Sequence, residues 1–349
     1  MTIPSKMDAI IKKELKKGIW LEKVDVPKPP YGWALIKIKR TSICGSDIHI
    51  FEWNEWAQRN VKQGMTIGHE FAGEIVQINC DDTMGFKVGD FVTAEGHVVC
   101  GKCKNCRIER QHLCPQTKGI GVNLNGIFAQ YAIAPVYNLW KCDPSIPLEE
   151  YSVFDPFGNA VHSALSFPLA GEDVLVTGAG PIGILTAAVA KKAGAANVVL
   201  TNRSNYRLDL AKKVCPEIVT VNTKEKSLEE VMKGLGIEGG FGVGLEMSGS
   251  GESLNLMVKN MIMGGNIALL GVFDHGIPVD WNKIIMGALT LKGIYGREMF
   301  KSWQQMNALV KSGLKLGQVI THRLHYTDYL KGFELMASKQ CGKVILEWD

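Results

Sequence analysis

Apolar and polar positions alternate differently in the two parts of the chain. Up to about residue 160, apolar residues fall into short alternating or β-branched runs that Gly and Pro interrupt, as at 33–40, 71–78, 89–96 and 128–135. A period of two is typical of half-buried strands, and the interruptions are typical of turns. This part of the chain is therefore predicted to be mainly β-strand.

From about residue 170 the pattern changes to an alternation of strands and helices. The segments that show it are 174–183, 184–195, 197–201, 205–215 and 264–273. Such alternation predicts a parallel, doubly wound sheet. A helical run at 301–313 and a final strand at 342–349 follow. We therefore expect an α/β protein in which a nucleotide domain (161–299) is inserted into a β-rich domain (1–160 and 300–349).

The composition is that of a globular protein with two domains. A length of 349 residues exceeds one ordinary core, and 46% hydrophobic with 21% charged residues is usual for such proteins. The net charge of +4 comes from scattered Lys and Arg, so nothing indicates a nucleic-acid or membrane partner. No apolar run reaches 18 residues and no signal-peptide core is visible, so we expect a cytoplasmic location.

Four of the nine cysteines form a compact cluster in the sequence, namely Cys100, Cys103, Cys106 and Cys114. Gaps of two residues let neighbouring thiolates reach one tetrahedral ion. Four thiolates leave no open position, which is typical of structural Zn²⁺ rather than of a disulfide framework in a cytosolic chain. The same spacing also permits an iron–sulfur cluster, and four unrelated thiols are a third interpretation.

A second set of possible ligands is dispersed. Cys44 lies in SICGSDIHI, and His69 and Glu70 lie in TIGHEFAGEI. Each alone is usually a buried thiol or an ordinary polar pair, but together they supply the incomplete tetrahedron of a catalytic zinc site. Asp155 could complete the set or bind a ligand through a hydrogen bond. His162, on the helix that follows, is expected to pack rather than to ligate.

The segment GAGPIG lies between a predicted strand and a predicted helix, which is the context that makes a glycine motif credible. Gly178 permits the tight turn, Gly180 lets the backbone approach a pyrophosphate, and Gly183 lets helix and strand pack closely. The pyrophosphate would lie at the helix N-terminus, against free N–H groups.

These motifs occur in the order found in the zinc-dependent medium-chain alcohol dehydrogenases, which the chain resembles over almost its whole length. The resemblance implies a GroES-like catalytic domain, a Rossmann coenzyme-binding domain, two Zn²⁺ per chain and an NAD or NADP cofactor. It also implies a homo-oligomer, a dimer or tetramer. The longer strings EWNEWAQ, FDPFGNAVHSALSF, LKGIYGREMF and GKVILEWD are similar to a bacterial branch that oxidises L-threonine. A glycine-forming ligase would then be a functional partner.

The resemblance also assigns roles to individual residues. Cys44, His69 and Glu70 would hold the catalytic zinc. Ser46 and His49 would carry the proton of the substrate hydroxyl away from it. The residues expected along the cofactor, beyond the three glycines, are Ile182, Arg207, Leu270, Gly271, Val272, Ile294 and Tyr295.

Recognition of the amino-acid end of the substrate is less defined by the sequence. A carboxylate needs a donor and an ammonium needs an acid. The candidates are Arg297, Glu298, Glu52 and Glu55, although each alone is more often a solvated surface charge. Two other functions stay open: a polyol or secondary-alcohol dehydrogenase on the same scaffold, and a non-catalytic nucleotide- or zinc-binding protein. Loss of a catalytic zinc ligand would mark the latter, and all three ligands are present.

One position departs from the expected pattern. A strand that ends beside a glycine motif usually carries an Asp or Glu for the ribose of NAD, but here Asn202 and Arg203 follow the strand. Asn202 removes a repulsion against phosphate, Arg203 adds a planar cation, and Ser204 adds a hydroxyl donor. With Arg207 one turn on, these residues predict a preference for NADP. The alternative is that Asn202 binds the ribose of NAD while Arg203 points into solvent.

Overall fold

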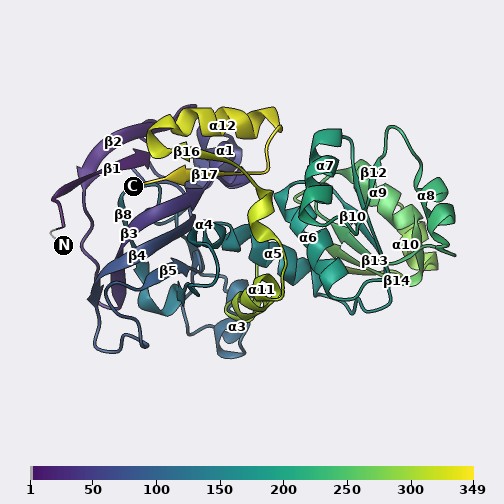
Figure 1. The fold of residues 1–349 in the computed structure, drawn as a ribbon, viewed down its shortest axis with the longest axis horizontal. Helices are drawn as coiled ribbons and strands as arrows, with labels where there is room; N and C mark the ends of the chain where they lie inside the picture. Colours follow the sequence, from purple (N-terminus) through teal and green to yellow (C-terminus); the bar gives the residue numbers. More distant parts are fainter. Residues whose placement is uncertain (1–2) are drawn as a thin grey trace. The chain divides into compact units, whose positions relative to one another are not determined.

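The computed structural model of the protein describes residues 3–349. The chain forms two compact units (Figure 1), one made of the residues up to Asp155 with Ile320–Asp349, and the other of Pro156–Val319. Residues 300–319 are predicted from the sequence to belong to the first unit, whereas the structure places them in the second. In that segment the ring of Trp303 lies 5.9 Å from the Arg297 guanidinium, which belongs to the second unit as well.

The first unit is built on a seven-stranded sheet whose order is β16-β17-β3-β4-β5-β9, with β8 also paired to β3. The long strands β3 and β4 run antiparallel and place Ser42 opposite Glu70. The last strand, β17, joins β3 over Arg40–Ser42, so the end of the chain lies beside its first third. The strands are β3 (Trp33–Ser42), β4 (Glu70–Asn79), β5 (Phe91–Ala94), β8 (Tyr131–Pro135), β9 (Leu139–Lys141), β16 (Ile320–His325) and β17 (Lys343–Glu347).

Shorter elements complete the first unit. They are β1 (Lys6–Ile11), β2 (Trp20–Asp25), α1 (Gly45–Glu52), α2 (Glu55–Asn60), β6 (His97–Val98), α3 (Lys104–Arg107), β7 (Lys118–Gly119), α4 (Leu148–Tyr151), α12 (Tyr329–Ser338) and 3₁₀ turns at Gln111–Leu113, Val136–Asn138 and Tyr326–Asp328. β1 pairs with β2, and β6 pairs with β7. Among residues 3–349 no helix combines the length and the apolar character that crossing a membrane requires.

A buried lysine connects the β1–β2 loop to α1. Lys12 Nζ donates to the carbonyl oxygens of Lys16, Gly18 and Ile50 at 2.5, 2.8 and 2.9 Å, and it lies 4.5 Å from the centre of the Trp53 ring. Burial lowers the pKa of Lys12 to about 8. Its acceptors include a carbonyl in the last turn of α1, where a cation is favourable. The loop is thereby held against the helix that carries Cys44, Ser46 and His49.

The second unit is a six-stranded parallel sheet in the order β12-β11-β10-β13-β14-β15. Numbered along the chain, this is the 3-2-1-4-5-6 order of a doubly wound dinucleotide fold, and the predicted sheet is confirmed. The strands are β10 (Asp173–Thr177), β11 (Asn197–Asn202), β12 (Val219–Asn222), β13 (Phe241–Glu246), β14 (Met261–Leu269) and β15 (Thr290–Gly293).

Helices connect these strands. They are α5 (Phe154–Ala164), which contains the boundary between the units, α6 (Pro181–Lys192), α7 (Asn205–Val214), α8 (Leu228–Leu235), α9 (Gly251–Lys259), α10 (Trp281–Met286) and α11 (Lys301–Lys311), with a 3₁₀ turn at Leu316–Val319. The crossovers from β10 to β11 and from β13 to β14 run in opposite directions across the sheet. Right-handed connections therefore put α6 and α9 on opposite faces. The order reverses between β10 and β13, which is where such folds bind ligands.

A buried carboxylate organises that edge of the sheet. Glu246 is the last residue of β13 and has no exposed surface. It accepts hydrogen bonds from Thr177 Oγ1 at 3.2 Å and from the backbone N–H groups of Ser248 and Gly249 at 2.9 and 3.2 Å. The Ser248 hydroxyl also donates to it. One carboxylate thus joins the ends of β10 and β13, so we interpret Glu246 as structural.

We predict that Glu246→Gln lowers the free energy of unfolding of the second unit by about 1–3 kcal/mol, because an amide replaces an acceptor oxygen by a donor facing other donors. Chemical denaturation checks this. The matched control is Glu252→Gln on α9, whose side chain is 82% exposed and which should stay within about 0.5 kcal/mol of the parent. Equal stability of the two variants would contradict the structural role.

Candidate active site

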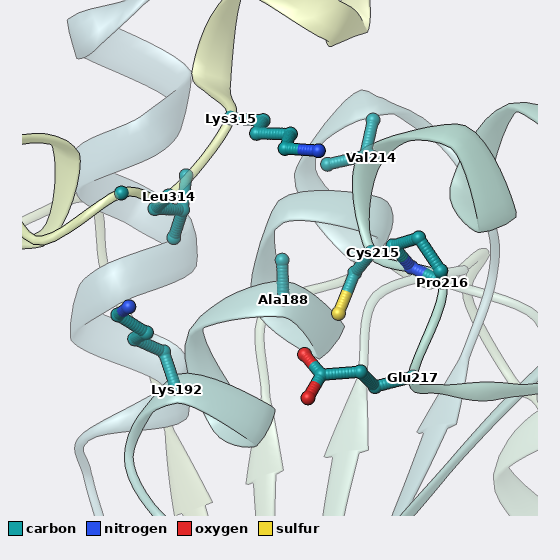
Figure 2. A pocket seen from close by; sticks show the side chains of 9 residues that line it. Ala188, Lys192, Val214, Cys215, Pro216, Glu217, Leu314 and Lys315 are labelled. Carbon is teal, nitrogen blue, oxygen red and sulfur yellow. The ribbon is translucent and has the colours of Figure 1, made fainter.

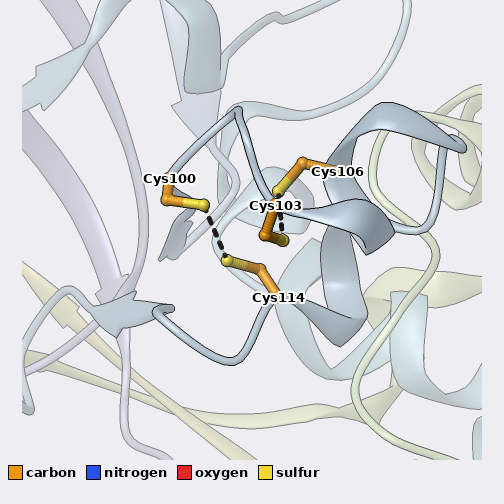
Figure 3. A group of neighbouring side chains, drawn as sticks. All are labelled: Cys100, Cys103, Cys106 and Cys114. Atoms are coloured by element: carbon orange, nitrogen blue, oxygen red, sulfur yellow. Dashed lines mark hydrogen bonds between the residues drawn. The ribbon is translucent and has the colours of Figure 1, made fainter.

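The four clustered cysteines converge on one point (Figure 3). Cys103 and Cys106 flank the start of α3, Cys100 follows β6, and Cys114 ends the 3₁₀ turn. All four sulfur atoms lie within 4.8 Å of one another, with separations of 3.5 Å for Cys103–Cys106 and 3.6 Å for Cys100–Cys114. Thiolates at about 2.3 Å from a tetrahedral zinc are about 3.8 Å apart.

This geometry fits a single Zn²⁺. A [4Fe–4S] cluster binds each thiolate to a different iron and a [2Fe–2S] cluster divides the four between two irons, so in either cluster the sulfurs on different irons are further apart than here. The surroundings favour the thiolate at two of the four positions, whereas burial raises the pKa of Cys106 to about 12. At Cys100, backbone N–H groups of Lys102 and Cys103 lower the pKa. At Cys114, burial raises the pKa, but N–H donors and neighbouring thiols bring it down to about 6. The site is closed by its four ligands, so its expected contribution is to the folding of this lobe.

The three dispersed ligands also meet. Cys44 is the N-cap of α1, His69 directly precedes β4, and Glu70 is the first residue of β4. One ligand atom from each lies within 4.8 Å of the others. Among residues 3–349, His69 Nδ1 and Glu70 Oε1 are buried and have no hydrogen-bond partner. Buried polar atoms without partners are costly unless something binds them, so the donor set fits a Zn²⁺ that would be held by thiolate, imidazole and carboxylate.

Three residues outside the predicted ligand set hold these ligands in place. Lys343 Nζ and Ser42 Oγ both contact Glu70 Oε2, and Lys343 also donates to Ile43 O at 2.9 Å. Asp47 is fully buried, accepts from the Cys44 N–H at 2.9 Å, and lies 3.8 Å from His69 Nδ1. Only Asp47 gave a signal in the sequence, as a carboxylate three residues after a ligand. Lys343 lies 273 residues after Glu70, the ligand that it contacts.

The charges of this cluster are strongly coupled. Burial raises the pKa of Asp47 to about 6, against the influence of His69 and of the Cys44 N–H. Burial alone would lower the pKa of His69. The negative charges of Cys44, Asp47 and Asp155 raise it by more than burial lowers it, so the net shift is upward. An excess of negative groups that draws a proton onto an imidazole is the environment in which a divalent cation is stabilised.

The residues predicted for the proton relay lie on α1. Ser46 is half-buried in its first turn, and His49 is exposed three residues later. Side chains three apart share one face of a helix, so the two can act in sequence. Asp155 lies in the first turn of α5 and acts on His69 electrostatically. His162 Nδ1 is 3.0 Å from Gly296 O, a backbone contact within the second unit.

The glycine motif has the geometry that its residues predict. Gly178 has φ +93°, and a Cβ there would lie 2.9 Å from Ser248 Cα. A Cβ at Gly183 would lie 1.8 Å from Gly178 O, so helix and turn pack in direct contact. At Gly180, the N-cap of α6, a Cβ would meet nothing within 4 Å. The space in front of the helix N-terminus is therefore open, as a pyrophosphate requires.

Other predicted cofactor residues lie at the same edge of the sheet. The N–H groups of Leu270 and Gly271 both donate to Glu246 O, at 3.0 and 3.2 Å, and Val272 is 93% exposed. Ile294 is buried after β15 while Tyr295 beside it is exposed. Ile182 is half-buried in the first turn of α6.

The polar residues at and after the end of β11 differ in their burial and in their contacts. Among residues 3–349, Asn202 Nδ2 and Arg207 Nε are buried atoms without hydrogen-bond partners. Arg203 is exposed, and its guanidinium lies 3.6 Å from the carboxylate of Glu252. Ser204 is the N-cap of α7, without a side-chain capping bond. The contact of Arg203 with Glu252 is not apparent from the sequence.

The candidates for binding the amino-acid end of a substrate are placed less favourably. Arg297 is 1% exposed, and a Cβ at Gly158 would touch its side chain at 2.6 Å. Glu298 is 2.6 Å from Lys301. Glu52 pairs with Lys17, and Glu55 pairs with Arg59 on α2.

A cavity of about 290 Å³ lies elsewhere in the second unit (Figure 2), between α6, the end of α7 and the chain after α11. Lys192, Lys315 and Glu217 are among its walls, and no residue predicted for the site lines it. Cys215 faces this cavity, and burial raises the pKa of its thiol, which keeps it protonated and unreactive. The candidate chemistry therefore lies outside this cavity.

Comparison with known proteins gives concordant results. The family model for the alcohol dehydrogenase GroES-like domain matches residues 30–144, and the model for zinc-binding dehydrogenases matches 181–312. An L-threonine 3-dehydrogenase of Stenotrophomonas maltophilia (strain K279a) is 51% identical over 98% of this chain and 100% of its own. One from Vibrio cholerae serotype O1 is 50% identical over 99% and 100%.

The fold has close counterparts among solved structures. An Escherichia coli CFT073 protein described as a short chain alcohol dehydrogenase, crystallised with NADH, has a TM-score of 0.88 at 26% identity. The match covers 99% of this chain and 100% of that one.

We predict that the two zinc sites separate under mutation. Cys44→Ser removes one of three ligands from an open site and should abolish turnover while leaving the fold and about one zinc ion per chain. Cys103→Ser should instead impair folding or solubility, because the closed site organises its own lobe. Metal analysis together with circular dichroism distinguishes the two. Full zinc content in an active Cys44→Ser protein would overturn the assignment.

Proposed function

The chain belongs to the zinc-dependent medium-chain alcohol dehydrogenase family, and on that premise we propose that it oxidises the β-hydroxyl of L-threonine to 2-amino-3-oxobutanoate, with hydride transfer to NAD(P)⁺. The observation that carries the proposal is the 50–51% identity, over nearly the whole chain, to proteins named L-threonine 3-dehydrogenase. The convergence of Cys44, His69 and Glu70 supports the same chemistry.

The residues of the first unit suit such a reaction. Zinc, when bound, would polarise the substrate hydroxyl and lower its pKa. Cys44, His69 and Glu70 would hold the ion, and Lys343 and Ser42 fix Glu70 so that its Oε1 stays available. Ser46 and His49 share a face of α1 and would pass the released proton towards solvent.

The residues of the second unit suit a dinucleotide. The open space before α6 would take the pyrophosphate, and the exposed segment at Val272 and Tyr295 would flank the nicotinamide end. The product, a β-keto acid, loses CO₂ to give aminoacetone or is cleaved by a coenzyme A-dependent ligase, so such a ligase is the proposed functional partner.

We predict that the pure protein turns over L-threonine and that its reactions contain aminoacetone. Ser46→Ala and His49→Ala should slow turnover by about 10²–10⁴-fold with unchanged zinc content, because they remove proton transfer and not a ligand. Steady-state kinetics with L-threonine and a polyol panel, alongside metal analysis, provide the measurement. Turnover of sorbitol or 2-butanol but not of threonine would select the polyol or secondary-alcohol function instead.

The proposal includes a preference for NADP⁺ over NAD⁺. The end of β11 lacks the acid that would repel a 2′-phosphate, and it offers buried donors without partners on Asn202 and Arg207. Arg203 is engaged by Glu252, but both side chains are largely exposed, at 64% and 82%. Exposed pairs of this kind are weak, so Arg203 is available to a phosphate.

We predict a ratio of kcat/KM that favours NADP⁺ by about tenfold to a hundredfold, the range expected for one charge-assisted contact. Asn202→Asp with Arg203→Val should reverse it towards NAD⁺. Glu252→Gln should increase it, because the competing acid is removed. A parent that favours NAD⁺ would refute the phosphate-binding role. A double variant without effect would show that other positions decide the preference.

A further inference from the structure

The ring of His49 is held by the helix that follows it. The chain reverses after α1 through Trp53, whose φ of 57° is left-handed, and the Asn54 N–H donates back to His49 O at 3.3 Å. This brings Asn54 Nδ2 to 3.0 Å from His49 Nδ1. The Trp56 ring stands edge-on to the imidazole, with centroids 6.2 Å apart.

The orientation of the Asn54 amide is fixed by a second contact. Asn54 is the N-cap of α2, and its Oδ1 accepts the N–H of Ala57 at 3.0 Å. A backbone N–H can only donate, so the atom facing Ala57 must be the oxygen and the atom facing His49 must be the amide nitrogen. That nitrogen is a donor without an acceptor lone pair. His49 Nδ1 must therefore be the acceptor.

We infer that Asn54 is a positioning residue that holds His49 as its Nε2–H tautomer. In a neutral imidazole one nitrogen accepts and the other carries the proton. With Nδ1 accepting from Asn54, the proton lies on Nε2, which is the nitrogen left for any relay. Nε2 in this form donates a proton and takes none up.

The consequence for turnover rests on the proposed function, whereas the tautomer itself does not. In alcohol oxidation the relay nitrogen of His49 must be bare, because it receives the proton that leaves the substrate hydroxyl. In the reverse direction it must carry a proton to return. Asn54 thus holds the resting neutral imidazole in a form whose Nε2 cannot accept the substrate proton, and each oxidation cycle requires the tautomer to change first, with Nδ1 giving up the hydrogen bond from Asn54 and carrying the proton instead.

The chain offers variants that separate this role from helix capping. Serine and aspartate are both good N-caps, so Asn54→Ser and Asn54→Asp should keep α2 intact. The serine side chain is too short to reach His49, and its hydroxyl is engaged by Ala57. The aspartate keeps the cap with one oxygen and presents the other, an acceptor, to His49 Nδ1. It should draw the proton onto Nδ1 and leave Nε2 bare.

The test is ¹⁵N NMR of histidine-labelled, zinc-loaded protein at about pH 8. The chain has eight His, and the His49 signals are identified by their loss in His49→Gln. We expect the Nε2–H pattern for His49 in the parent, averaging between tautomers in Asn54→Ser, and the Nδ1–H pattern in Asn54→Asp. An Nδ1–H pattern in the parent, or an Nε2–H pattern in Asn54→Asp, would overturn the inference.

The kcat for oxidation is a second measurement, and it should not change if Asn54 only stabilised the fold. Asn54→Asp should raise kcat for oxidation by about fivefold, which is the equilibrium factor of one net hydrogen bond. The midpoint temperature of thermal unfolding should be the same in this variant as in the parent. A lower kcat in Asn54→Asp would contradict the inferred role. Absence of threonine turnover in every variant, with the expected NMR patterns, would refute the proposed function while the tautomer assignment stands.

Discussion

A buried ion pair between Lys343 and Glu70 is the contact on which the candidate metal site depends. The two side chains are 3% and 0% exposed and come from the last strand and from β4. Burial alone lowers the pKa of Lys343, but Glu70 and Cys44 raise it above its usual value, so the ammonium stays charged. Removing one partner of such a pair typically costs about 3–5 kcal/mol, because the other charge is left buried and unpaired.

The pair also determines which oxygen of Glu70 is available. Lys343 and Ser42 both engage Oε2, and Oε1 is left buried without a hydrogen-bond partner among residues 3–349. Since Lys343 also binds Ile43 O, one ammonium fixes the carboxylate and the backbone next to Cys44 together. A residue of β17, the last strand along the chain, therefore fixes the positions of Cys44 and Glu70, which occur early in the sequence.

The sequence predicted those features whose causes are local. The spacing predicted that Cys100, Cys103, Cys106 and Cys114 gather at one point, and the strand–glycine–helix order predicted close contact of Gly178 and Gly183 with their turn. The sequence did not reveal Lys343 or Glu252, because their partners are brought to them by strand pairing and loop packing, nor Glu246, whose contact with Thr177 depends on the pairing of β10 with β13. A lysine in GKVILEWD resembles any strand residue until β17 is known to lie beside β3. The boundary between the two units could not be placed from the sequence either, because packing contacts such as that of Trp303 with Arg297 decide to which unit residues 300–319 belong.

Two acids, Glu246 and Glu252, lie near the carboxyl ends of the parallel strands, and their tertiary contacts decide whether either could bind a ribose. Glu246 accepts four hydrogen bonds and is fully buried, so it has no free oxygen for a ribose. Glu252 is exposed and reaches Arg203 at 3.6 Å, beyond hydrogen-bonding distance. Neither therefore replaces the acid that is missing after β11. A 2′-phosphate carries more charge than one carboxylate and would compete with Glu252 for Arg203. The adenosine end of a cofactor at this edge would then meet Asn202, Arg203 and Arg207, a set that provides donors and positive charge.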